Sequence, residues 1–198
     1  MNVGTRLTAQ GAFAHITTLE QVVASYRERF DFSSQGGHHD PVLAWCKKAF
    51  TLESAIVRAC SGRREDGKMF SKGSCVKTSS RGELATELLI RQEALEEVPD
   101  FEGVYDVVDG CSVKGIGRMM KYNVSERVGA YLKIYPQNFV YLHAGPLKGY
   151  RRLTGHRGEV HRVPKSSLPR EFQELSIHDI EDCLCEYRDV LRREMWNG

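Results

Sequence analysis

The sequence predicts a mainly helical protein, a compact multi-helix domain that contains a pair of helices joined by a glycine hairpin. Three observations predict this class. Apolar residues recur at helical spacing through most of the chain, whereas strand-like alternation is scarce. Capping residues and prolines stand where helices would begin. Hydrophobic residues make up 41% of the 198 residues, which is enough apolar mass for a core.

The first half of the chain predicts four helices and one long loop. Thr18, Asp40 and Thr51 can cap helices, and apolar residues follow each of them at helical spacing. Pro41 suits the first turn of the second helix. The expected elements are helices over 18–30, 42–50, 51–60 and 81–98, with a polar, glycine-containing loop over 62–80. The last of these helices is amphipathic and acidic.

The second half predicts the helix pair, over about 101–132, and then a more irregular region. Asp100 can cap a helix that ends at Gly110, and a second apolar stripe follows Gly117. The apolar run 139–142 can be a strand or a buried connector. The remaining expected elements are a basic helix over 147–153, an extended basic loop over 154–169 and a last helix over 177–196, capped by Ser176. We expect a single domain over 1–198, with two lobes as the alternative.

The net charge of +2 conceals two segments of opposite sign. Residues 83–109 contain nine Asp/Glu and one Arg, whereas residues 111–170 contain twelve Lys/Arg and two Glu. A basic segment of this density can hold a polyanion, and nucleic acid is the partner it suits. The alternative is that two solvated surfaces of opposite sign partly pair with each other.

Composition also bears on location and cofactors. No stretch approaches the roughly 18 apolar residues of a membrane span, and the first residues lack the apolar core of a signal peptide. We therefore expect an intracellular, cytoplasmic protein with no membrane partner. Six cysteines without a C-x-x-C pair suit reduced thiols, most of them small buried hydrophobes. We expect no cofactor and no metal; a metal site using Cys75, His38 or His39 is the weaker alternative.

The segment 113–118, Val-Lys-Gly-Ile-Gly-Arg, is the most informative motif of the chain. Its two glycines predict a tight turn, and the helix after it would present free N–H groups at the positive end of its dipole. Such a terminus binds an anion, most simply a phosphate. Flanking Lys and Arg side chains would add affinity without reading sequence. The alternative is a helix corner in which the glycines serve packing only.

The basic residues after the hairpin extend this candidate interface. Those of the expected helix 147–153 and loop 154–169 could hold further phosphates of a DNA backbone, duplex or damaged. The complete expected contact set is Lys114, Gly115, Ile116, Gly117, Arg118, Lys121, Lys148, Arg151, Arg152, Arg157, Arg162 and Lys165.

The helix pair over 101–132 resembles the helix-hairpin-helix element of DNA-binding proteins. Its continuation through Val-Tyr-Leu-His at 140–143 is similar to the helix-hairpin-helix DNA glycosylases, a resemblance that implies a helical fold and action on DNA in repair. The catalytic Asp of that family falls at Tyr141, whose phenol, with a reference pKa of about 10, is no base near neutral pH. The Schiff-base Lys of its lyase members falls at Met119. Short phrases of the chain are also similar to those of a group of bacterial proteins.

Three residues are candidates for chemistry. His143 could make a phosphate contact or transfer a proton, as an imidazole side chain can; a structural histidine is equally compatible. Asp109, just before the hairpin, could act as a base or could simply end its helix. Tyr141 could stack on a flipped base, although a core tyrosine is the favoured interpretation.

The sequence is compatible with three functions. The first is DNA binding by the hairpin and the basic segment. The second is an enzyme acting on DNA, a divergent glycosylase or a metal-dependent nuclease. Carboxylates at 182, 186 and 189 of the last helix could hold Mg²⁺ for the nuclease, although a solvated acidic face is the simpler account. The third is a protein-interaction module whose acidic helix docks a basic partner of unknown identity.

Overall fold

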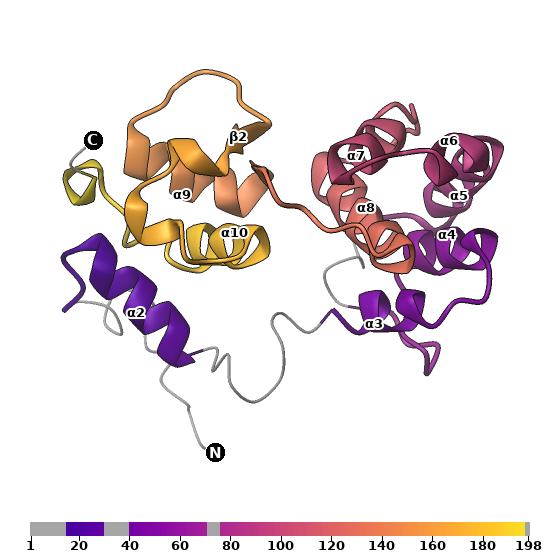
Figure 1. The fold of residues 1–198 in the computed structure, drawn as a ribbon, viewed down its shortest axis with the longest axis horizontal. Helices are drawn as coiled ribbons and strands as arrows, with labels where there is room; N and C mark the ends of the chain where they lie inside the picture. The colour runs from indigo at the N-terminus through magenta and orange to yellow at the C-terminus, as the bar shows by residue number, and fades with distance from the viewer. Residues whose placement is uncertain (1–14, 30–39, 71–75, 197–198) are drawn as a thin grey trace, which may run out of the picture. The chain divides into compact units, whose positions relative to one another are not determined.

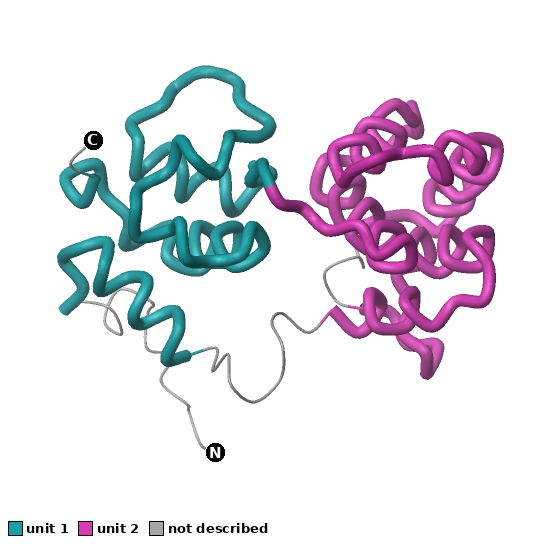
Figure 2. The backbone as a smooth tube through the Cα atoms, in the orientation of Figure 1, with its two compact units in different colours: residues 1–38, 138–198 teal, residues 39–137 magenta. Residues whose placement is uncertain are grey.

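The computed structural model describes residues 15–29, 40–70 and 76–196. The protein is mainly helical, as the sequence predicts, and the described strands form one two-stranded sheet (Figure 1). The chain divides into two compact units. Unit 2 is the continuous segment His39–Gln137, and unit 1 joins Met1–His38 to Asn138–Gly198 (Figure 2). Each unit has a hydrophobic core of its own.

Unit 2 consists of helices packed around α8. Its elements are α3 (Pro41–Lys47), α4 (Leu52–Ser61), α5 (Thr78–Ile90), α6 (Gln92–Glu96), α7 (Phe101–Asp109) and α8 (Arg118–Leu132). Helix α8 packs against α3, α4 and α7, so that Val124 and Val128 lie fully buried in the core. The expected helix pair is thus present as α7 and α8.

The predicted caps of unit 2 are confirmed. Asp40 Oδ1 accepts a hydrogen bond from Val42 N at 2.8 Å, and Asp100 Oδ1 accepts one from Gly103 N at 2.9 Å. Thr51 and Ser54 form a reciprocal capping box at the start of α4. These caps satisfy N–H groups that a helix start otherwise leaves without partners.

Two helix boundaries of unit 2 differ from expectation. Helix α3 ends at Lys47, short of residue 50, because the amides of Lys48 and Ala49 bond three residues back and Thr51 must be extended to cap α4. The expected helix 81–98 begins earlier, at Thr78, and breaks at Arg91. There the backbone N–H bonds to Leu88 O at 3.1 Å, which closes the helix with a tighter turn.

Unit 1 combines helices with the short sheet. Its elements are α2 (Leu19–Arg29), β1 (Phe139–Tyr141), α9 (Ala144–Thr154), β2 (Arg162–Pro164), η2 (Lys165–Ser167), η3 (Arg170–Phe172), α10 (Ile177–Glu186) and η4 (Arg193–Met195). Strands β1 and β2 are antiparallel, with Phe139 opposite Pro164 and Tyr141 opposite Arg162. The run 139–142 therefore begins as a strand, and its partner lies in what the sequence predicts to be a loop.

The last helix is shorter than expected. Helix α10 ends at Glu186, well before Trp196. Tyr187 leaves the helix and donates its hydroxyl hydrogen to Ser25 Oγ at 2.9 Å, and the chain then turns so that Leu191 is also buried. Ile177, Ile180 and Leu184, the apolar face of the helix, are buried, but a turn replaces the end of the predicted helix.

Glycines allow α9 and α10 to pack closely. A Cβ added at Gly149 would overlap the carbonyl group of Leu184, and one added at Gly145 would overlap Cys185 Sγ. These glycines lie one turn apart on α9, so the two backbones approach along one face. Only glycine fits at such a contact.

Candidate nucleic-acid interface

The hairpin between α7 and α8 is a tight turn. Ile116 N donates to Val113 O at 3.2 Å, and Gly115 has φ +86°, a conformation that L residues with a side chain rarely adopt. Gly117 is extended and stands as the N-cap of α8. The Gly-Ile-Gly sequence therefore forms the turn that the sequence predicts.

Two contacts hold the turn against the rest of unit 2. The side chain of Ile116 is buried in the core together with Met120 and Val124. Ser80 on α5 donates its hydroxyl hydrogen to Lys114 O at 2.8 Å. The apolar residue thus anchors the turn from inside, and the serine fixes its backbone. The sequence offers no local signal for Ser80, because it lies 34 residues before its acceptor.

The outer side of the turn is open. Gly117 is exposed, and a Cβ added there would meet no atom of the described chain within 4 Å. Gly117 has no side chain to cap the first-turn N–H groups of α8, and Met120 N donates to Gly117 O at 3.0 Å. Lys114 is exposed and Arg118 is half-buried beside these groups. The combination of a helix N-terminus and basic side chains suits an anion.

Lys121 and Asp109 pair with each other. Lys121 Nζ donates to Asp109 O at 2.6 Å and lies 3.0 Å from Asp109 Oδ1. The lysine therefore also satisfies a carbonyl at the C-terminus of α7, where a cation is favourable. This pair holds α7 against α8. A phosphate contact by Lys121, or action of Asp109 as a base, would have to compete with the pair.

The basic residues of unit 1 are placed on α9 and around the sheet. Lys148 Nζ and Arg152 Nη1 lie 2.9 Å and 3.2 Å from Asp189 Oδ1, and the pKa of that carboxyl is lowered by the Lys148 hydrogen bond and by the positive charges around it. Arg151 donates to Gly158 O at 3.0 Å. Arg162 lies over the ring of Phe139, and Arg157 and Lys165 lie on the segment around β2.

The expected contact residues thus fall into two groups. Those of the hairpin, from Lys114 to Lys121, belong to unit 2, as does Asp109. Those from Lys148 to Lys165 belong to unit 1, together with Tyr141 and His143. Each group therefore lies within a single unit.

His143 contacts a carboxylate that no local pattern in the sequence connects to it. Its Nε2 atom pairs with Glu181 Oε1, a residue on α10 that is itself buried. His143 is the residue before α9, so the pair joins the start of α9 to α10. Tyr141 is buried in unit 1, as expected of a core tyrosine.

The acidic residues of the last helix do not share one face. Asp182 and Glu186 lie on α10, but Asp189 follows the end of the helix and pairs with α9. The weaker alternative, a carboxylate trio for Mg²⁺, is therefore not supported. No group of three His, Cys, Asp or Glu side chains within 15–29, 40–70 and 76–196 could hold a metal ion. Cys75, His38 and His39 lie outside these residues.

The described cysteines are free thiols. Burial raises the pKa of both Cys46 and Cys60 to about 12, which keeps them protonated. Cys183 and Cys185 point to different neighbours, as expected of helix residues two apart: Cys183 lies in the core and Cys185 lies against Gly145.

No helix in the described part of the chain combines the length and apolar character needed to cross a membrane. Comparisons with protein-family models, with characterised proteins and with solved structures found no match for this chain.

Proposed function

We propose that this protein binds DNA by its phosphate backbone, with the hairpin of unit 2 as the principal contact. One observation carries the proposal: the N-terminus of α8 ends in an exposed glycine with open space around it, beside Lys114 and Arg118. A phosphate could approach the first-turn amides of α8 and accept hydrogen bonds from them. The anchored turn supports this function, because binding then needs little ordering of the backbone.

Resemblance to the helix-hairpin-helix element supports the same proposal. The basic groups of unit 1, including Arg151 and Arg157, would add phosphate contacts that carry no sequence information. Binding of this kind weakens steeply with salt and shows little sequence preference.

Fluorescence anisotropy with a labelled duplex of random sequence tests the proposal. We expect binding at low salt, with log Kd rising linearly with log salt concentration. Absence of binding to duplex, single-stranded and abasic DNA at low salt would remove it.

A matched pair of glycine variants locates the contact. Gly117→Ala adds one methyl group where the structure shows open space, so it should fold normally and hinder the approach of a phosphate. Gly82→Ala adds a methyl group to an open, exposed position on α5 of the same unit. We expect at least fivefold weaker binding for Gly117→Ala and none of this loss for Gly82→Ala.

A second pair separates the amide from the charge. Position 118 is the first residue of α8, where proline is well tolerated and removes an N–H group. Arg118→Ala removes the same side chain but keeps the amide. Weaker binding by Arg118→Pro than by Arg118→Ala would therefore report the backbone contact.

An enzyme acting on DNA is the second candidate, and the observation that favours it is the His143–Glu181 pair. A carboxylate that orients a histidine is a common arrangement for proton transfer. Incubation with uracil-containing, oxidised and abasic duplexes, with and without Mg²⁺, tests this function. Release of a base or cleavage of a strand by the parent protein, and loss of this activity in His143→Gln, would establish the enzyme function.

A further inference from the structure

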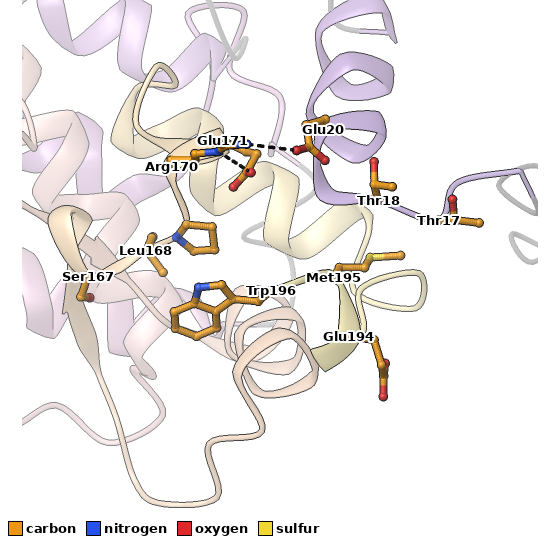
Figure 3. Close-up of a pocket in the computed structure, with 11 residues that line it drawn as sticks. Thr17, Thr18, Glu20, Ser167, Leu168, Arg170, Glu171, Glu194, Met195 and Trp196 are labelled. Carbon is orange, nitrogen blue, oxygen red and sulfur yellow. Dashed lines mark hydrogen bonds and ion pairs between the residues drawn. The ribbon is translucent and has the colours of Figure 1, made fainter. Parts of the chain in front are cut away.

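Unit 1 contains a cavity of about 770 Å³ that the DNA-binding proposal does not use. It lies between the start of α2, the segment 167–171 and the segment 194–196, all of unit 1 (Figure 3). A volume of this size is in the range that accommodates a small organic molecule.

One wall of the cavity is apolar and aromatic. Trp196, Met195 and Leu168 line it, and Trp196 and Met195 pack against the core of unit 1. Figure 3 shows the indole ring of Trp196 lying across the cavity from Glu20 and Glu171. An indole face attracts cations more strongly than other aromatic side chains do.

The opposite wall carries carboxylates. Glu20 and Glu171 line it, and Glu194 is a further lining residue of the cavity, so three acids accompany a single Arg in the lining. Hydrogen bonding to its own backbone N–H, then to Thr18, lowers the pKa of Glu20, which keeps this carboxyl ionised. The cavity therefore carries net negative charge.

A guanidinium group already lies on this pair of carboxylates. Arg170 Nε is 3.2 Å from Glu171 Oε1, and Arg170 Nη2 is 3.8 Å from Glu20 Oε1 (Figure 3). The Arg170 side chain is 88% exposed, whereas that of Glu171 is 16% exposed. An exposed ion pair is a weak interaction, so an incoming cation could displace this side chain at little cost.

The start of α2 does not turn the cavity into an anion site. The N–H groups of Thr17 and Thr18 donate to Gln21 Oε1 at 2.7 Å and 3.2 Å. Amides that would otherwise attract an anion are thus satisfied within the helix cap. The remaining chemistry of the cavity favours positive charge.

We propose that this cavity binds a small organic cation, a guanidinium or ammonium group on an apolar stem. The stem packs on Trp196 and Met195, and the cationic head pairs with Glu171 and Glu20 in place of Arg170. The same chemistry could arrive as a free metabolite or as a basic side chain of a peptide. This site is independent of the hairpin, which belongs to unit 2.

Tryptophan fluorescence provides a direct test in the full chain. The protein has two tryptophans, so Trp45→Phe leaves Trp196 as the sole reporter. Butylguanidinium and butylurea are matched probes of similar shape, one charged and one neutral. We expect a saturable change of Trp196 emission with butylguanidinium and at least tenfold weaker binding of butylurea. Equal responses to the two probes would overturn the proposal.

Variants then assign the contacts. Glu171→Gln should weaken butylguanidinium binding at least tenfold, whereas Glu174→Gln, on an exposed carboxylate outside the cavity, should leave it unchanged. Arg170→Ala should tighten binding, because it removes the internal competitor. If Glu171→Gln does not fold, the affinity of Arg170→Ala for butylguanidinium still tests the proposal. Unchanged affinity in Arg170→Ala would count against the site.

A titration with a short arginine peptide distinguishes the two sources of the cation, a free metabolite and a peptide side chain. Acetyl-Gly-Arg-Gly-amide that binds at least tenfold more tightly than butylguanidinium identifies a peptide side chain as the ligand. Equal or weaker binding of this peptide identifies a free small molecule.

Discussion

Arg127 and Asp40 form a buried ion pair in unit 2, although 87 residues separate them in the sequence. Arg127 Nη2 lies 2.9 Å from Asp40 Oδ2, and the arginine side chain is only 2% exposed. Arg127 also donates to Ala59 O at 3.1 Å, while Asp40 caps α3. One pair thus connects α8, α4 and the start of α3. It also removes one arginine of the basic segment from the surface.

Breaking this pair should destabilise unit 2 strongly. Asp40→Ala removes the helix cap and leaves the Arg127 charge buried without its carboxylate, which typically costs about 3–5 kcal/mol. Asp40→Asn keeps an oxygen that can cap α3, so it should be about 1 kcal/mol less destabilising than Asp40→Ala. Urea unfolding followed by circular dichroism measures both. Asp66→Ala, at an exposed pair with Arg64, is the control and should cost much less than either Asp40 variant.

Local signals explain what the sequence could predict. A cap needs a side chain and an amide three residues later, and the caps at Thr18, Asp40, Thr51, Asp100 and Ser176 are all found. The Gly-Ile-Gly turn is likewise encoded within a few residues, since its positive φ falls on Gly115. Helical periodicity then predicts which residues are buried.

Contacts between segments that are distant in the sequence have no local signal of this kind. Arg127 counts as a surface charge in the sequence, and only the fold brings Asp40 to it. Strand β2 has three residues, which is too short to show alternation, and it exists because β1 pairs with it. The close packing at Gly149 depends on Leu184 of α10, a residue that no local pattern connects to it.

Ser80 should position the hairpin for DNA binding. Ser80→Ala removes the hydrogen bond to Lys114 O without changing any charge. The turn should then sample more conformations, and we expect about threefold to tenfold weaker DNA binding, which corresponds to the ~1 kcal/mol of one hydrogen bond. Anisotropy at fixed salt measures it, with the exposed neighbour Ser79→Ala as control. An unchanged salt dependence together with the weaker affinity would separate positioning from loss of a phosphate contact.

Phe50 is an exposed aromatic side chain that could contact a nucleic acid under the proposed function. This side chain, between α3 and α4 of the unit that carries the hairpin, is 95% exposed. Exposed rings can stack on unpaired bases, which contributes about 1–3 kcal/mol per base. Phe50→Ala should therefore weaken binding of single-stranded or abasic DNA at least fivefold and leave thermal stability unchanged. Similar losses for intact duplex and single strand would argue against stacking.

Alkaline pH should destabilise the protein through its buried thiols. Burial raises the pKa of Cys46 from 9.0 to about 12, and that of Cys60 by the same amount. Above pH 9 the unfolded chain loses these protons while the folded chain keeps them, so stability falls as pH rises toward 12. Each thiol contributes a slope of up to ~1.4 kcal/mol per pH unit.

Urea unfolding at pH 8, 9 and 10 measures this slope. The highest pH of the series is 10, about the ordinary pKa of a phenol, so that ionisation of tyrosines contributes little to the slope. Cys46→Ala should reduce the slope even though it lowers stability at every pH. A slope that is unchanged in this variant would contradict the role of the buried thiol.

Gly149→Ala should destabilise unit 1 by forcing α9 away from α10. The added methyl group would overlap the backbone of Leu184, which cannot move as a flexible side chain could. Overpacking of this kind costs about 1–3 kcal/mol and occasionally more. In contrast, Gly82→Ala on α5 meets open space and should gain up to ~1 kcal/mol from helix propensity. Thermal unfolding of both variants measures the difference. A Gly149→Ala protein as stable as the parent would show that the two helices can separate without cost.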